Sequence, residues 1–124
     1  MNLLIDTHAL FWFFSNDERL SQKARNHIRR SLKIFIPTIV LLELFRMMDK
    51  KGLINQFNII LSELKNGTNN SIVSLDLPIT EKSFKLQPSL EMHDAVVVAT
   101  AQLLKVPIIT KDETIQKVYP QTIW

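Results

Sequence analysis

The chain has 124 residues, of which 46% are hydrophobic and 22% charged, and its formal net charge is +3. This balance is typical of a globular protein, and 2 Gly and 5 Pro are too few for a collagen, a flexible linker or a disordered tail. The absence of cysteine excludes disulfides, thiolate zinc sites and cysteine nucleophiles. No apolar stretch approaches the roughly 20 residues of a membrane span, so no membrane association is expected.

The positive charge lies in the first half of the chain. Residues 1–62 hold nine Lys and Arg against five acids, whereas residues 63–124 hold six against seven. A polyanionic partner would therefore meet the first half more favourably. We expect a cytoplasmic protein, because no basic and apolar leader precedes Asp6 and no cysteine is present.

Apolar runs and helical patterns alternate along the chain. In chain order, the sequence predicts a strand at 2–5, helices at 9–14 and 20–31, a strand at 34–36, helices at 38–51 and 53–65, a loop at 68–71, a strand at 72–75, helices at 79–86 and 92–105, a strand at 106–110, a helix at 112–118 and a strand at 122–124. Such alternation indicates an α/β protein with a parallel sheet covered on both faces. Ligands of these sheets bind beyond the carboxyl ends of the strands, where the strand order reverses.

Two aspartates follow strands that we expect to be neighbours. Asp6 comes directly after the first strand, and Asp112 lies two residues after Thr110 at the end of the fourth. In the usual doubly wound order these strands pair at the switch point, which brings both side chains to one edge of the sheet. The alternative is that each Asp caps the helix that follows it.

Two further carboxylates lie on helices. Glu43 stands among apolar neighbours, where a carboxylate is costly without a partner, and Arg46 on the same helix is the alternative partner. Asp94 opens the buried helix at 92–105, where the helix dipole alone would favour it. If the four acids converge they repel one another unless a cation intervenes, and all-oxygen ligation suits Mg²⁺ or Mn²⁺.

Three other polar residues near these acids have simpler interpretations. Asp76 also follows a strand, but one at the edge of the sheet, and we interpret it as a cap or turn residue. His8 and His93 each lie beside a candidate site carboxylate, and we expect them to pack or support rather than to bind metal.

Four segments together resemble the PIN-domain ribonucleases, specifically the toxins of VapBC-type toxin–antitoxin pairs. They are residues 3–8 (LLIDTH), 42–44 (LEL), 93–101 (HDAVVVATA) and 109–112 (ITKD), in the family's order and close to its usual spacing. The resemblance implies a single PIN domain over residues 1–124, with a three-layer α/β/α fold around a parallel sheet of four to five strands. It also implies Mg²⁺- or Mn²⁺-dependent cleavage of RNA, a VapB-type antitoxin as partner and a homodimer.

The same resemblance assigns roles to individual residues. Asp6, Glu43, Asp94 and Asp112 match the family's acidic positions, and Thr110 matches a hydroxyl residue that supports the site. In the expected mechanism the carboxylate-held metal activates a water for attack on the phosphodiester. Either Asp6 or Asp94 takes the proton.

Two further features are candidate interaction surfaces. The only basic run without an acid is a candidate for RNA binding, with a solvated helix face as the alternative; it consists of Lys23, Arg25, Arg29, Arg30 and Lys33. The five consecutive apolar residues at 10–14 are a candidate interface, unless the chain's own helices cover them.

Two other functional classes stay open. A non-catalytic nucleic-acid-binding module would not need all four acids. A phosphoacceptor signalling domain, with Lys111 as its basic residue, would leave Glu43 without a role. A phosphatase of the Asp-x-Asp type is excluded in its usual form, because His8 occupies the second Asp position.

Overall fold

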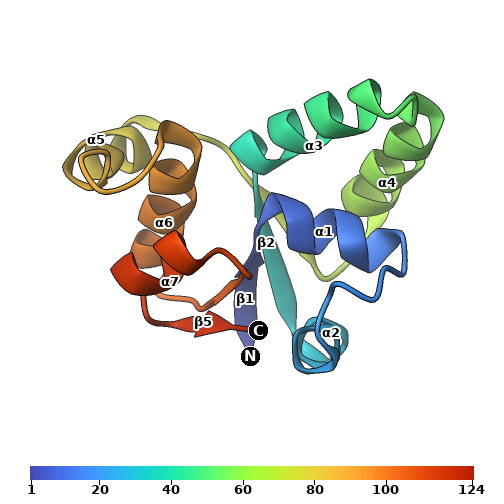
Figure 1. Ribbon diagram of the computed structural model, residues 1–124, viewed down its shortest axis with the longest axis horizontal. Coiled ribbons are helices and arrows are strands. Elements are labelled where there is room, and N and C mark those ends of the chain that lie inside the picture. Colours follow the sequence, from blue (N-terminus) through green and yellow to red (C-terminus); the bar gives the residue numbers. More distant parts are fainter.

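Five short strands alternate with seven helices along the chain (Figure 1). The computed structural model describes all residues, 1–124. The strands are β1 (Asn2–Ile5), β2 (Lys33–Pro37), β3 (Asn70–Val73), β4 (Ile108–Ile109) and β5 (Thr122–Ile123). The helices are α1 (Thr7–Phe14), α2 (Gln22–Arg30), α3 (Thr38–Lys50), α4 (Ile54–Asn66), α5 (Leu77–Leu86), α6 (Met92–Leu104) and α7 (Glu113–Val118).

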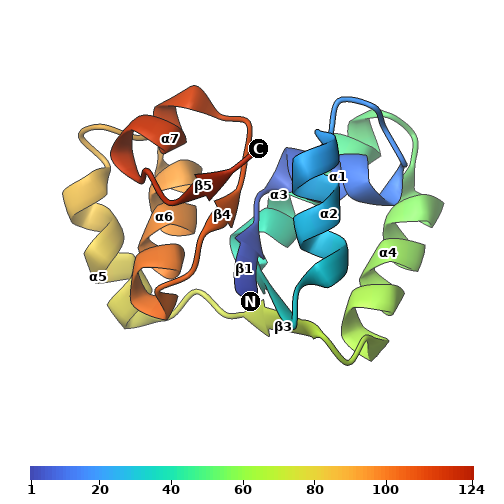
Figure 2. The same cartoon turned by 90° about the horizontal axis from the view of Figure 1, so that it is seen from below.

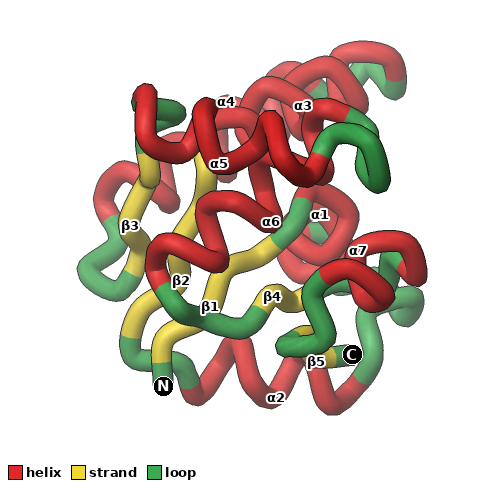
Figure 3. Tube along the Cα trace, turned by 90° about the vertical axis from the view of Figure 1, so that its left-hand side faces the viewer, coloured by secondary structure: helices red, strands yellow, loops and turns green.

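The strands form one parallel sheet in the order β3-β2-β1-β4-β5 (Figure 3). This order confirms that the first and fourth strands are neighbours and that the third lies at an edge. Ile5 in β1 pairs with Ile109 in β4, so both strands end at the same level. Asp6, which follows β1, and Asp112, which follows β4, therefore lie at the same edge of the sheet.

Helices cover both faces of the sheet, which confirms the predicted three-layer α/β/α sandwich. Figures 1 and 2 show α5, α6 and α7 on one side of the sheet and α1, α2 and α4 on the other. Helix α3 follows β2 beyond its carboxyl end and contacts α1, α4 and α6. It thereby bridges the two helical layers above the edge at which β1 and β4 end.

Burial explains why the central strands are continuous apolar runs. In β1 and β4 the side chains of Leu3, Leu4, Ile5, Ile108 and Ile109 are fully buried. Helix α6 is buried at every position from Ala95 to Ala101, as expected for a helix that is apolar on most sides. These residues belong to one core cluster of 32 buried side chains, which fixes the sheet edge on which the candidate site is built.

The third strand differs from its prediction. It spans Asn70–Val73, two residues earlier than the predicted 72–75, and so takes in part of the predicted loop at 68–71. Asn70 pairs with Ile34 of β2, and Val73 pairs with Pro37. Because β3 lies at the edge of the sheet and pairs only with β2, polar residues are tolerated in it, and apolar content alone did not indicate its start.

The helix boundaries agree with the predictions within a few residues. The first helix begins at Thr7 rather than at residue 9, because Asp6 caps it. Ser21 caps α2, because its hydroxyl accepts a hydrogen bond from the Ala24 N–H at 3.0 Å. Gly52, at φ +71°, follows the end of α3 in the left-handed conformation that favours glycine. None of the helices has the length and apolar composition needed to cross a bilayer.

Candidate active site

Asp6 and Asp112 both stand at the start of a helix beyond the carboxyl end of a strand. The Asp6 carboxylate accepts a hydrogen bond from the Ala9 N–H at 2.9 Å and so caps α1. The Asp112 carboxylate accepts from the Ile115 N–H at 2.9 Å and caps α7. Both side chains also line one cavity, so capping and membership of the candidate site are compatible.

Helices α3 and α6 bring Glu43 and Asp94 to the same cavity. Its volume is about 640 Å³, and all four predicted acids line it. Asp94 lies in the first turn of α6, whereas Glu43 lies in α3, which crosses above the sheet edge. The structure therefore brings together four carboxylates from segments that are far apart in the sequence.

The acids are close enough to perturb one another. Burial and, to a smaller extent, the negative charges of Asp112, Glu43, Glu91 and Asp6 together raise the pKa of Asp94 from 3.8 to about 6. Burial likewise raises the pKa of Asp6 to about 6, although hydrogen bonds from Thr110 and from the Ala9 N–H oppose the shift. Two carboxylates in one cavity with pKa values near 6 are well placed to exchange protons near neutral pH.

These raised pKa values predict a pH-dependent stability of the metal-free protein. The folded state holds the protons of Asp6 and Asp94 more tightly than the unfolded state. Their contribution to stability is therefore fully present below about pH 4 and is lost as the pH rises through about 6. Melting in EDTA between pH 4 and 7 should show a steeper decline for wild type than for Asp94→Asn. Parallel curves for the two proteins would contradict the shift at Asp94.

Glu43 is held by partners from other elements rather than by its own helix. The Thr7 hydroxyl donates to Glu43 Oε1 at 2.9 Å, and His93 Nδ1 lies 3.9 Å from Oε2. No ion pair joins Glu43 to Arg46, which is exposed, so the alternative partner considered from the sequence is wrong. Thr7 is a site residue that sequence reasoning missed, and its position directly after Asp6 was the available signal.

Thr110 connects the two aspartates that follow strands. Its side chain is fully buried, and its Oγ1 accepts a hydrogen bond from the Asp112 N–H at 3.0 Å. Its hydroxyl also lowers the pKa of Asp6 against the effect of burial. The predicted supporting position of Thr110 thus has a physical basis in the contacts of both Asp6 and Asp112.

The three secondary candidates lie where the sequence placed them. Asp76 caps α5 by accepting from the Ile79 N–H at 3.0 Å, and it does not line the cavity. The His8 ring packs 5.5 Å from the ring of Trp12, measured between centroids. His93 lies beside Glu43, as described above. His8 also lines the cavity.

Several cavity residues were not among the predicted residues of the metal site or the RNA-binding surface. Glu91 and Glu113 add two exposed carboxylates, and Arg19 and Lys111 add two exposed cations. Charged residues in exposed loops and first turns carry no distinctive sequence pattern. Their place at the cavity depends on the way in which the loops fold over the sheet edge.

The donor chemistry of the cavity fits a hard divalent cation. All of its acidic ligand candidates supply oxygen, as Mg²⁺ and Mn²⁺ prefer. No group of three or more His, Asp or Glu side chains has the closed arrangement of a finished metal site. Ligation of one cation by three or more of these carboxylates therefore requires them to lie closer together than they do.

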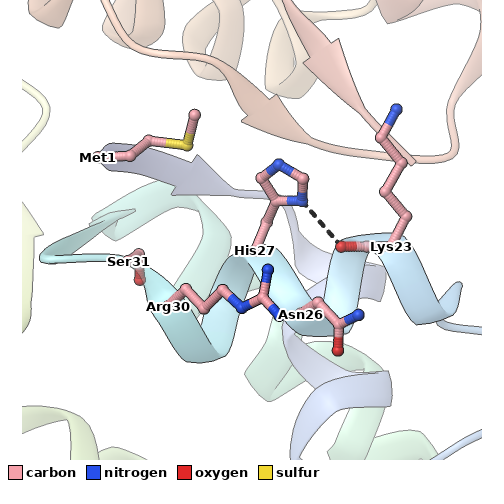
Figure 4. Close-up of a pocket in the computed structure, with 6 residues that line it drawn as sticks. All are labelled: Met1, Lys23, Asn26, His27, Arg30 and Ser31. Atoms are coloured by element: carbon pink, nitrogen blue, oxygen red, sulfur yellow. Dashed lines mark hydrogen bonds between the residues drawn. The ribbon is translucent and has the colours of Figure 1, made fainter.

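The basic run divides into a buried and an exposed part. Arg25 is buried and donates from Nη2 to the Asp17 carbonyl at 3.1 Å, so it is not on the exposed basic face that the sequence predicted. Lys23 and Arg30 line a separate pocket of about 390 Å³ on α2 (Figure 4). In that pocket the His27 Nδ1 faces the Lys23 carbonyl at 2.9 Å. Arg29 and Lys33 are exposed nearby.

The apolar run at 10–14 is covered only in part. Leu10 and Trp12 are buried, whereas the three Phe side chains of the run are partly buried. Phe11 and Phe14 line an apolar groove of about 380 Å³ between α1, α3 and α4. Ile59 lies on the same groove with 59% of its surface exposed. The chain's own helices therefore leave an apolar surface open on this side.

Fold and cavity together define an α/β protein with an acidic site at the carboxyl edge of a parallel sheet. The chain belongs to the PIN domain family, whose sequence profile matches residues 3–120. Among curated protein sequences, none matches the chain.

Several solved structures share this fold. A toxin–antitoxin complex from Klebsiella pneumoniae is 23% identical with a TM-score of 0.72, and the match covers 98% of this chain and 96% of the other. VapC20 from Mycobacterium tuberculosis, a Sarcin-Ricin loop cleaving toxin, is 10% identical with a TM-score of 0.78, over 94% and 95% of the chains. VapBC-1 from nontypeable Haemophilus influenzae is 14% identical with a TM-score of 0.73, over 97% and 94%.

Proposed function

We propose that this protein is a metal-dependent endoribonuclease that acts as the toxin of a toxin–antitoxin pair. The observation that carries the proposal is the convergence of Asp6, Glu43, Asp94 and Asp112 on one cavity of a PIN domain. RNA is the substrate that the family resemblance implies. The description of VapC20 as a Sarcin-Ricin loop cleaving toxin supports a cleavage activity of this kind.

The four carboxylates are the residues that would hold Mg²⁺ or Mn²⁺. Such a cation, when bound, would neutralise negative charge on the phosphate and lower the pKa of a water molecule. Asp6 and Asp112 keep fixed positions because each caps a helix, and Thr7 orients Glu43. Thr110 fixes the relation between the two capping aspartates through its bond to the Asp112 N–H.

Hydrolysis requires a proton acceptor as well as charge neutralisation. A water oxygen attacks phosphorus and gives up a proton, one P–O bond of the backbone breaks, and the leaving oxygen takes up a proton from the solvent. Asp6 and Asp94 are the candidate acceptors, because each has a pKa of about 6 and lies in the cavity. No covalent intermediate with the protein is required.

The direct test is incubation of the purified protein with labelled single-stranded RNA in Mg²⁺, Mn²⁺ or EDTA. We expect RNA fragments with either metal and intact RNA in EDTA. RNA that is bound but stays intact with every metal would overturn the nuclease proposal and favour the non-catalytic nucleic-acid-binding module.

We propose that the exposed part of the basic run contacts the RNA backbone outside the cavity. Removing one phosphate contact on a single strand should flatten the salt dependence of affinity by about 0.7 in log–log slope. The double variant Arg29→Ala, Arg30→Ala removes two exposed cations and should therefore lower the slope by up to about 1.4. Binding titrations at several KCl concentrations measure it, and an unchanged slope would refute this role.

We also propose a VapB-type antitoxin as the partner. The support is that structural neighbours are toxin–antitoxin assemblies and that the groove between α1, α3 and α4 is apolar and open. Such a groove suits an apolar segment of a partner protein. Because RNA and an antitoxin would both be met in the cytoplasm, we propose that location.

A homodimer is the oligomeric state that we expect from the family resemblance. Leu42 on α3 is 66% exposed and adds apolar surface outside the groove. Light scattering at micromolar concentration should give twice the mass of one chain. A strictly monomeric mass at that concentration would contradict the dimer.

A further inference from the structure

Arg19 is one of two exposed cations, with Lys111, at the wall of a predominantly acidic cavity. It lies in the loop between α1 and α2 and lines the cavity together with the four candidate metal ligands. Its side chain is 61% exposed. Nothing in the sequence pattern marked it, and the mechanism described above gives it no role.

Asp17 and Trp12, which are not among the four candidate metal ligands, hold the Arg19 guanidinium in place. Arg19 Nε donates to Asp17 Oδ1 at 3.1 Å and Nη2 donates to Oδ2 at 2.8 Å, which is the two-pronged geometry that arginine forms with carboxylates. The Arg19 guanidinium carbon lies 5.2 Å from the ring centroid of Trp12.

The loop that carries the pair is itself fixed. Asp17 Oδ1 also accepts the Arg19 backbone N–H at 2.8 Å, and the buried Arg25 donates to the Asp17 carbonyl at 3.1 Å. Trp12 is buried and its ring packs edge-on against Trp124, with centroids 5.9 Å apart. Arg19 is therefore presented from a rigid base rather than from a free loop.

This arrangement separates Arg19 from the catalytic acids. An unrestrained arginine beside four carboxylates would pair with them and neutralise ligands that the metal needs. The ion pair with Asp17 satisfies one edge of the guanidinium, while its remaining N–H groups stay available. The cavity holds six carboxylates and only two cations from Lys and Arg, so a phosphate entering it needs such a donor.

We propose that Arg19 binds a backbone phosphate of the RNA next to the bond that is cut, and that Asp17 and Trp12 position it for that contact. The inference rests on the proposed ribonuclease function and names a residue that places its substrate. A guanidinium suits this task because its planar fork matches phosphate oxygens, which a lysine ammonium does not.

The competing interpretation is that the Asp17–Arg19 pair only stabilises the loop. Exposed ion pairs contribute little to stability, so this interpretation predicts small changes in melting and none in RNA binding. The two interpretations therefore differ in the affinity for RNA, in KM and in the salt dependence of binding.

The first test compares Arg19→Ala and Arg19→Lys with the control Arg46→Ala, which removes an exposed arginine of α3 that does not line the cavity. The probe is a fluorescein-labelled single-stranded RNA, titrated in EDTA at several KCl concentrations and cleaved in Mn²⁺. Arg19→Ala should bind about tenfold more weakly, with a salt slope lower by about 0.7. Its KM should rise with little change in kcat. Arg19→Lys should keep the slope but recover only part of the affinity, and Arg46→Ala should match wild type.

The second test addresses positioning by Asp17. Asp17→Asn keeps an oxygen for the Arg19 backbone N–H but removes the charge that holds the guanidinium. It should weaken RNA binding in the wild-type background and have no further effect in the Arg19→Ala background. Equal effects in both backgrounds would show a loop-stabilising role and overturn the positioning proposal.

The outcomes separate this inference from the proposed function. If wild type cuts no RNA with any metal but Arg19→Ala still weakens RNA binding, the nuclease proposal fails and the role of Arg19 in binding RNA stands. If wild type cuts RNA and correctly folded Arg19→Ala binds and cuts it equally well, the inference about Arg19 is wrong. Absence of RNA binding by wild type would overturn it as well.

Discussion

Changing any one of the four cavity acids to its amide should abolish metal-dependent RNA cleavage. The variants are Asp6→Asn, Glu43→Gln, Asp94→Asn and Asp112→Asn. Each keeps the shape of the side chain but removes an anionic metal ligand. Loss of a residue that only orients a ligand costs about 10–100-fold, so loss of a ligand itself should lower the cleavage rate on the order of a hundredfold or more. Initial rates on labelled RNA in Mn²⁺ measure the effect.

Asp76→Asn is a matched control for this series. Asp6, Asp112 and Asp76 each cap a helix by the same kind of bond to a backbone N–H, at 2.9, 2.9 and 3.0 Å. Asparagine is also a good capping residue, so all three amide variants should fold. Only Asp76 lies outside the cavity, and Asp76→Asn should cleave at the wild-type rate. Wild-type turnover in Asp94→Asn, or complete loss in Asp76→Asn, would refute the assignment.

Mn²⁺ should raise the melting temperature of the wild-type protein by several degrees. A ligand that binds only the folded state stabilises it by RT ln(1 + [L]/Kd), which is about 2.7 kcal/mol at a hundredfold excess over Kd. For a domain of this size, that free energy corresponds to a shift of several degrees. Melting curves in EDTA and in Mn²⁺ give the shift directly.

The Asp6→Asn variant should differ from wild type both in its melting temperature without metal and in its response to Mn²⁺. Without metal it should melt at or above the wild-type temperature, because burial disfavours the charged form of Asp6 and Asp112 repels it. With Mn²⁺ it should gain much less stability than wild type. A purely capping role predicts instead that the variant is neutral or destabilised and that neither protein responds to Mn²⁺.

Much of the fold could be predicted because its strongest signals are local and periodic. The buried strands at Asn2–Ile5 and Ile108–Ile109 are short apolar runs, and the nearly all-apolar stretch of α6 admits no exposed face. Edge strand β3 could not be located as well, since strand pairing rather than apolar content fixes its start at Asn70. Parallel pairing of β1 with β4 then places Asp6 and Asp112 together without further information.

The four acidic residues of the candidate site could be predicted from the sequence, but the contacts that hold them in position could not. A carboxylate on an apolar helix, as at Glu43, stands out in a sequence because burial of a charge is costly. The Thr7 hydroxyl that holds Glu43 and the Asp17–Arg19 pair do not stand out, because polar residues in loops and caps are common. The burial of Arg25 could not be predicted either, because a run of basic residues does not indicate which of its side chains is buried.

The most direct measurement is a calorimetric titration of Mn²⁺ into wild type, Asp6→Asn and Asp76→Asn at neutral pH. The convergence of the four acids on one cavity predicts equal affinity for wild type and Asp76→Asn, and binding at least about tenfold weaker for Asp6→Asn. Equal Mn²⁺ affinity of wild type and Asp6→Asn would contradict the assignment of this cavity as the metal site of the protein.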